Sequence, residues 1–364
     1  MLVPELLVSR NRALIENNWY FGKRFGQYGH PFIWVDGDAE VSVHPTLSLL
    51  QHFSSWFSTY YETYEWPVSL AGELSDEVEK AVKEEFRTLT TFFGIHKVFS
   101  AADYETYLTC HSRSRAIDIR ILQLRAPDLN LSRMFHLDFG PGMGGHALWN
   151  SIFREKDFLE KEKRGGKGIY LGAEINDSNY ALQRSVLSYL AIRNQSEHVD
   201  TLALESMGVL PLTKASLDLP SGSFAQIPSW HLGLVPQESV DLITATTVLN
   251  EISHSGIAYF AEQVLRTLKL GGFLYVKDSA KVKPGRHNID WEAFLLSVGF
   301  IEITNLDGLR HRENIHGIPR LYKKTSSNLV TFDSIMDQFV GNNAMTLHGG
   351  SMVQNISSHF SDKI

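Results

Sequence analysis

The sequence has little that would place it in an oxidising compartment, in a membrane or on a nucleic acid. Cys110 is the only cysteine, so the chain cannot form an internal disulfide. No stretch approaches the roughly 20 apolar residues that span a bilayer. Glu5, Arg10 and Arg12 interrupt the apolar core that a secretory signal would need. We therefore expect a cytoplasmic protein without a membrane partner.

Basic charge is scarce as well. The formal net charge is −7 at pH 7, whereas proteins that bind a phosphate backbone usually present a basic face. Nucleic acid is therefore not an expected partner, and a small molecule is the expected substrate. The 364 residues, 43% of them hydrophobic, suffice for two domains and a large core.

The two ends of the chain differ in pattern from its middle. Residues 1–125 are expected to be mostly helical and to form a cap that contributes to the substrate pocket or to dimerisation. Within them, the aromatic-rich stretch 44–66 predicts a packed helix, with a pocket wall as the alternative, and the stretch after Ser75 predicts a helix that stops at Gly94. Residues 326–364 form a tail, either a frayed terminus or an arm on a neighbouring subunit. A homodimer is a hypothesis that rests on these outer regions alone.

The middle region, 126–325, alternates short apolar runs with helical segments. This alternation predicts an α/β fold in which a doubly wound, mostly parallel sheet carries helices on both faces. One strand is ambiguous, near 201–204 or near 212–216, with 221–237 as an inserted wall of the pocket. The other expected strands are 134–139, 169–173, 240–245, 273–276, 300–306 and 320–324, and the expected helices are 145–154, 178–192, 256–268 and 290–298.

The sharpest local feature is FHLDFGPGMGGHA, residues 135–147, where an apolar strand runs through glycines directly into a helix. Glycine is needed where a chain turns tightly and where backbone approaches a ligand. The helix that follows leaves free amides facing the same crevice. Gly140, Gly142 and Gly145 also satisfy the GxGxxG pattern of dinucleotide sites. The turn alone therefore indicates a nucleotide-type cofactor without saying which one.

Asp138 and two later motifs separate the cofactor classes, and Glu174 accompanies them. Asp138 ends the strand ahead of the glycines, where the diphosphate of a dinucleotide would make a carboxylate unfavourable. S-adenosylmethionine has no phosphate and carries a cationic sulfonium and an ammonium group. Glu174 ends the next strand, where a carboxylate accepts ribose hydroxyls in either class. Farther along stand VDLITATTVLNEIS, residues 240–253, and AEQVLRTLKLGGFLYVKD, residues 261–278.

In this order the four features resemble the class I S-adenosylmethionine-dependent methyltransferase family over roughly residues 130–325. The resemblance implies a Rossmann-like sheet of seven strands and S-adenosyl-L-methionine as the cofactor. The implied cofactor contacts are Asp138 and the backbone of Gly140, Gly142 and Gly144 around the amino-acid part, Glu174 on the ribose, Asp218 on the adenine, and Thr246 and Thr247 beneath the sulfonium. For Asp218, Thr246 and Thr247, the alternative that they are plain turn or strand-end residues stays open.

A hydroxyl acceptor would also need a base, and candidates should follow the carboxyl ends of the strands near 240–245 and 273–276. His254 is the preferred base, and Asp278 and His287 are the other catalytic candidates. A metal held by Asp278, His287 and Asp290 is conceivable, but we expect none. By analogy with bacterial methyltransferases of this layout, the first hypothesis is an O-methyltransferase acting on a sugar or a secondary metabolite. The sequence does not distinguish an oxygen atom from a nitrogen atom as the methyl acceptor.

Two other functions remain open. A nicotinamide-dependent oxidoreductase could use the same glycines, although Asp138 and the LRTLKLGG segment disfavour it. The other is a catalytically inactive binding subunit with the same fold, because the strand near 201–216 is poorly defined and no residue stands out as the catalytic base.

Two absent features limit the class of methyl acceptor. The run after the strand at 240–245 lacks the Asn/Asp-Pro-Pro-aromatic motif of adenine N-methyltransferases, and Cys110 lies upstream of the turn, which removes a cysteine nucleophile for cytosine methylation.

Overall fold

A computed structural model describes residues 76–159, 168–174, 177–201, 217–249, 252, 254–278, 291–304, 318–328 and 330–341. The expected aromatic helix at 44–66 and the tail beyond 341 lie outside the described residues. Among those described, no helix is both long enough and apolar enough to cross a membrane.

The described strands form a single sheet in the order β3-β4-β2-β1-β5-β6-β8-β7. β8 runs antiparallel to β6 and to β7, and the other neighbouring pairs are parallel. The predicted doubly wound, mostly parallel α/β fold is confirmed, with eight strands in the described part where seven were expected. The strands are β1 (Phe135–Phe139), β2 (Ile169–Glu174), β3 (His198–Asp200), β4 (Phe224–Pro228), β5 (Val240–Thr246), β6 (Leu268–Asp278), β7 (Phe300–Glu302) and β8 (Ile318–Lys324).

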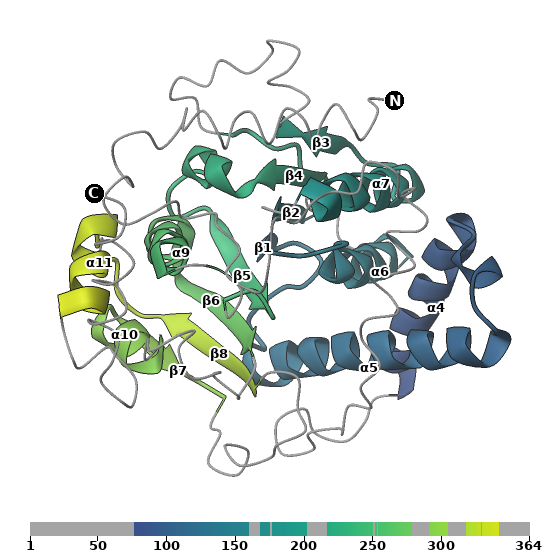
Figure 1. Ribbon diagram of the computed structural model, residues 1–364, viewed down its shortest axis with the longest axis horizontal. Coiled ribbons are helices and arrows are strands. Elements are labelled where there is room, and N and C mark those ends of the chain that lie inside the picture. The colour runs from purple at the N-terminus through teal and green to yellow at the C-terminus, as the bar shows by residue number, and fades with distance from the viewer. Residues whose placement is uncertain are drawn as a thin grey trace, which may run out of the picture.

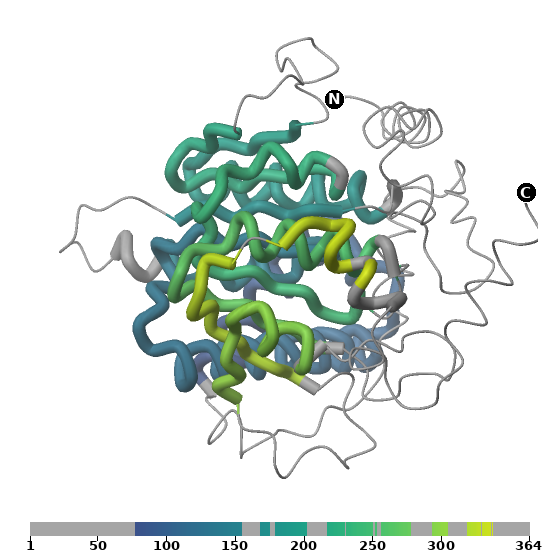
Figure 2. The backbone as a smooth tube through the Cα atoms, turned by 90° about the vertical axis from the view of Figure 1, so that its left-hand side faces the viewer, coloured from purple at the N-terminus to yellow at the C-terminus, as the bar shows by residue number. Residues whose placement is uncertain are grey.

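Helices cover both faces of the sheet (Figure 1). In Figure 2, α9 to α11 lie in front of the strands, and the blue helices α4 and α5 lie behind them. One face carries α4 (Asp76–Phe92), α5 (Ala101–Arg125), α6 (Gly145–Leu159) and α7 (Asp177–Arg193). The other carries α9 (His254–Thr267), α10 (Trp291–Ser297) and α11 (Phe332–Gly341), and two short 3-10 helices, η1 (Ile95–Lys97) and η2 (Ser229–Leu234), complete the described elements.

Alternation along β1 gives the sheet two different faces. Phe139 points to the α9 side, where its ring centroid lies 4.5 Å from that of Phe260. His136 points to the α6 side, where its ring centroid lies 5.3 Å from that of Trp149. Because successive strand residues point to opposite faces, Asp138 shares the face of His136. Each face therefore has its own core, and the one on the α6 side contains polar groups.

Helices α4 and α5 belong to the core on the α6 side. Val82, Phe86 and Leu89 recur at helical spacing along α4 and are at most 1% exposed. They join the same apolar cluster as residues of α6, α7 and the sheet. Gly94, with a φ of 72°, follows the end of α4 as expected. Residues 76–125 thus share one core with the sheet.

The ambiguous strand lies elsewhere than expected. β4 pairs with β2 and occupies residues inside 221–237, so this stretch belongs to the sheet and is not an insertion as expected, whereas its role as a pocket wall stays a prediction. All five residues of β4 are buried, but Gln226 and Pro228 conceal the apolar run that normally identifies a buried strand. β3 is a short edge strand just before 201–204, and residues 202–216 lie outside the described part.

Candidate functional site

The direction in which the sheet is built changes between β1 and β5. From β1 the sheet is built outwards through β2 and β4, whereas from β5 it is built in the opposite direction through β6. The helices that follow these two strands, α6 and α9, lie on opposite faces of the sheet (Figure 1). In open α/β sheets, ligands bind outside the carboxyl ends of the strands at such a switch point. The glycine turn and the end of β5 both lie there.

The glycine turn has a backbone that other residues adopt with difficulty. The φ angles of Gly140, Gly142 and Gly144 are 62°, 57° and 86°, in the left-handed region where a Cβ is unfavourable. Packing adds a second requirement at Gly140, because a Cβ there would lie 2.8 Å from the Cβ of Val248. The turn is therefore held both by its own conformation and by the residues after β5.

Two hydrogen bonds fasten the turn to the end of β2. The backbone N–H of Gly140 donates to the carbonyl of Ala173 at 2.9 Å. The N–H of Gly142 donates to a carboxylate oxygen of Glu174 at 3.1 Å. Helix α6 then begins at Gly145, and its first amides have no partner within the helix. One backbone amide of the turn is therefore already hydrogen-bonded to a carboxylate.

Both carboxylate oxygens of Asp138 accept hydrogen bonds from buried side chains. The Thr244 hydroxyl donates to Oδ1 at 2.6 Å, and the Tyr170 hydroxyl and His146 Nδ1 donate to Oδ2 at 2.8 Å and 3.0 Å. Burial opposes ionisation, but His146 and the hydrogen bonds from His146 and Thr244 lower the pKa of Asp138 to about 2. Asp138 is therefore a buried carboxylate at neutral pH.

His136 extends this network as a neutral imidazole. Asn150 Nδ2 donates to His136 Nδ1 at 2.9 Å, so His136 Nε2 carries the proton and lies 2.7 Å from the Thr244 hydroxyl. Burial lowers the pKa of His136 to about 3. Nitrogen or oxygen atoms of His136, Asp138 and His146 lie within 4.8 Å of one another. Because each side chain already has hydrogen-bond partners, we interpret the group as a positioning network rather than an open metal site.

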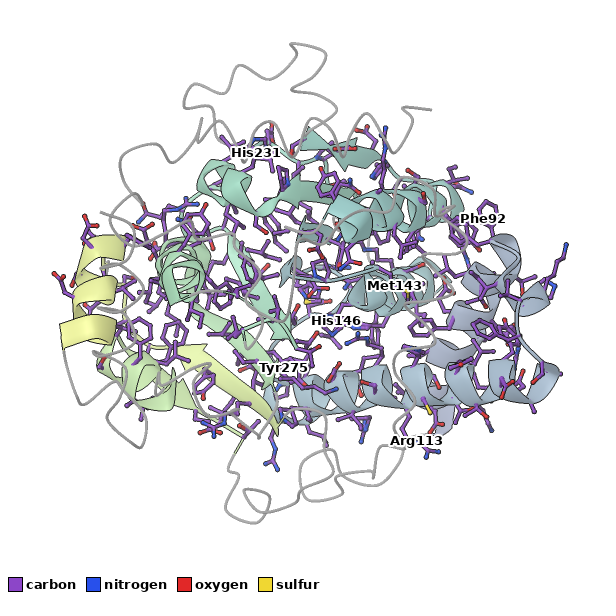
Figure 3. All side chains as sticks on the ribbon, in the orientation of Figure 1. Phe92, Arg113, Met143, His146, His231 and Tyr275 are labelled. Atoms are coloured by element: carbon purple, nitrogen blue, oxygen red, sulfur yellow. The ribbon has the colours of Figure 1, made fainter. Side chains whose placement is uncertain are left out.

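Asp118, in the second half of α5, joins the helix to the sheet. Its Oδ1 accepts from the Tyr275 hydroxyl at 2.5 Å and from Lys277 Nζ at 2.9 Å. Its Oδ2 lies 3.2 Å from His146 Nε2 and 3.3 Å from Arg115 Nη1. Burial opposes ionisation, but Lys277, His146 and Arg115 together hold the pKa of Asp118 well below its usual range. In Figure 3, His146 and Tyr275 lie in the interior between α5 and the sheet.

His146, in the first turn of α6, bridges the two carboxylates. Its Nδ1 faces Asp138 and its Nε2 faces Asp118, and the side chain is 2% exposed. Burial and the nearby Arg115 oppose a charge on the ring, but the two carboxylates outweigh them and raise the pKa of His146. A chain of alternating acidic and basic side chains therefore runs from β1 through α6 to α5, and on to Lys277 of β6.

No protein-family model and no curated protein sequence matches this chain. Among solved structures, phosphoethanolamine N-methyltransferase 1 of Haemonchus contortus aligns with 87% of this chain at 10% identity and a TM-score of 0.35, and the alignment spans 56% of that protein's length. Magnesium protoporphyrin IX methyltransferase of Synechocystis aligns with 70% of this chain and 99% of its own at 11% identity and a TM-score of 0.37. An S-adenosylmethionine-dependent methyltransferase of Aquifex aeolicus aligns with 56% of this chain and 92% of its own at 16% identity and a TM-score of 0.30. Likenesses this distant assign no activity, so the function has to be inferred from the chain's own residues.

The predicted cofactor residues have different positions in the structure. Glu174 lies against the glycine turn, and Thr246 ends β5 beside Lys277 of β6. Thr247 has a φ of 55°, which is rare and strained for a β-branched residue and is a feature of functional sites. Asp218 is exposed and precedes β4, and its contact with the adenine stays a prediction.

The predicted catalytic residues lie at the same end of the sheet as far as they are described. His254 is the first residue of α9, two residues earlier than the expected helix start, and Asp278 is the last residue of β6. Their side chains are outside the described part, as are His287 and Asp290. The catalytic roles of His254, Asp278 and His287 therefore stay predictions.

The charged network contains residues that sequence reasoning did not select. His146 could have been noticed as a histidine directly after the turn, and Lys277 as the neighbour of Asp278. Asp118 carries no such signal, because it lies 159 residues from Lys277 in the chain. Only folding brings them together.

Proposed function

We propose that this chain is an S-adenosylmethionine-dependent methyltransferase that acts on a small-molecule acceptor. The observation that carries the proposal is the buried carboxylate of Asp138 in β1, directly ahead of the glycine turn. In a dinucleotide site the amides of this turn face a diphosphate. The buried carboxylate of Asp138 beside them repels that group, whereas the cofactor proposed here has no phosphate.

The chemistry of the turn fits this cofactor. Glu174, at the end of β2, can accept ribose hydroxyls, and the positive-φ glycines allow the amino-acid part to approach the backbone. Asp138 accepts all the hydrogen bonds described for it from other side chains, so we assign it to holding the turn. Thr246 and Thr247 are proposed to form the floor next to the transferred methyl group.

When bound, the cofactor supplies a methyl group that its sulfonium has already activated. The chain's own residues therefore have to align the acceptor, exclude water and, for a hydroxyl acceptor, take up a proton. His254 remains the proposed base, with Asp278 and His287 as the other candidates. We propose a hydroxyl of a sugar or a secondary metabolite as the acceptor, and residues 1–125 as the region that helps to enclose it.

Thermal unfolding in the presence of ligands tests the proposal. S-adenosylhomocysteine at 100 times its dissociation constant should stabilise the full chain by about 2.7 kcal/mol, and NAD should not. Stabilisation by NAD alone would establish the oxidoreductase alternative. Incubation with labelled cofactor and a metabolite extract then tests catalysis, because a cofactor that is bound but never consumed would indicate a binding subunit.

A further inference from the structure

Arg115 of α5 lies directly against the first residue of α6. A Cβ on Gly145 would come within 2.7 Å of Arg115 Nε and 3.1 Å of its Nη2. Any larger residue at 145 would therefore displace the guanidinium. The Arg115 side chain is 14% exposed, so it is largely enclosed but can still be reached by a ligand.

The guanidinium uses only one of its three nitrogens within the described residues. Nη1 lies 3.3 Å from Asp118 Oδ2 and 3.2 Å from His146 Nε2. Nε and Nη2 make no hydrogen bond in the part of the chain that the structure describes. Asp118 is a shared counter-ion, because Lys277 contacts it more closely, at 2.9 Å. Arg115 is thus held in place by one nitrogen and presents two more donors.

The surroundings of Arg115 favour a further anion beside it. The amino end of a helix carries partial positive charge, which favours negative groups and opposes cations. Arg115 nevertheless lies at the amino end of α6, with the raised-pKa ring of His146 beside it. A negative group placed there would be attracted both by the guanidinium and by the amides that begin α6.

We propose that Arg115 binds the α-carboxylate of the methionine part of S-adenosylmethionine. This inference rests on the proposed function, which places that part of the cofactor at the glycine turn next to Gly145. The carboxylate is the only anionic group of that cofactor at neutral pH. Nε and Nη2 lie on one edge of the guanidinium and can donate to both oxygens of a carboxylate.

Binding of S-adenosylmethionine and of its decarboxylated analogue to the full chain, measured by titration calorimetry, tests the proposal. The wild-type chain should bind S-adenosylmethionine about 10- to 100-fold more tightly than the analogue, the range expected for a charge-assisted hydrogen bond. Arg115→Met should weaken S-adenosylmethionine binding by that factor and leave binding of the analogue unchanged. Arg115→Lys should retain part of the preference, because the charge remains but the paired donors are lost.

Arg113 provides a matched control on the same helix. It pairs with Glu79 at 3.4 Å and lies on the outer side of α5 in Figure 3, so Arg113→Met should bind both compounds as the wild type does. Retained binding of the analogue also shows that Arg115→Met is folded. Equal weakening of both compounds by Arg115→Met, or no weakening of either, overturns the proposal. A wild-type chain that binds neither compound overturns the proposed function itself.

Discussion

Replacing Asp138 with Asn would remove the buried charge on which the network ahead of the glycine turn depends. A pKa lowered from 3.8 to about 2 in the folded chain corresponds to about 2 kcal/mol of stability at neutral pH. The amide would also place a donor where the carboxylate accepts from Thr244, Tyr170 or His146. We therefore expect Asp138→Asn to lower the free energy of unfolding by about 2 to 5 kcal/mol at pH 7.

The same substitution has a predictable pH dependence. Because the pKa of Asp138 is lower in the folded chain than in the unfolded one, its stabilisation is complete well above pH 4 and is lost as the pH falls towards 2. Asparagine does not titrate. The difference between wild type and variant should therefore shrink by about 1 kcal/mol between pH 7 and pH 3, where an unfolded aspartate is mostly protonated.

Urea unfolding followed by circular dichroism at pH 7 and pH 3 measures both quantities. Asp128→Asn is the matched control, since Asp128 is exposed in the turn after α5, and it should change stability by less than about 0.5 kcal/mol. The reasoning is refuted if Asp138→Asn is as stable as the wild type at pH 7. It is also refuted if the difference is the same at both pH values.

Two further substitutions test the turn and the proposed base. Gly140→Ala should destabilise the chain by about 2 to 5 kcal/mol, because the left-handed φ and the overlap with Val248 both oppose a Cβ, and a urea midpoint equal to that of the wild type would contradict this. His254→Ala should reduce turnover about 10²- to 10⁴-fold while leaving S-adenosylhomocysteine affinity intact, and unchanged turnover in the labelled-cofactor assay would exclude His254 as the base.

Local patterns were enough to predict the elements that carry the turn. The run 134–139 is apolar and ends in glycines, so its strand, its turn and the start of α6 followed from neighbouring residues alone. The sequence does not reveal β4 for an equally local reason, because Gln226 and Pro228 interrupt its apolar character, although both are buried in the sheet. β3 has only three residues, too few to produce a period.

The charged network could not have been predicted in the same way. A sequence shows that Asp118, His146 and Lys277 exist, but their partnership depends on α5 crossing the sheet face next to β6. The same holds for Arg115, whose importance comes from its contact with Gly145. Gly145 belongs to the GxGxxG pattern of cofactor sites, and in the structure it also makes room for a side chain from another helix.

The position of Asp118 has a consequence for how the chain can be divided. The sequence suggests a boundary between residues 125 and 126, yet Lys277, deep in the sheet, has its carboxylate counter-ion on the other side of that boundary. A fragment beginning at 126 would leave the buried Lys277 without its counter-ion and expose the apolar surface that α4 and α5 cover. We therefore expect the preceding helices and the sheet to fold and unfold together, as one cooperative unit that cannot be separated there.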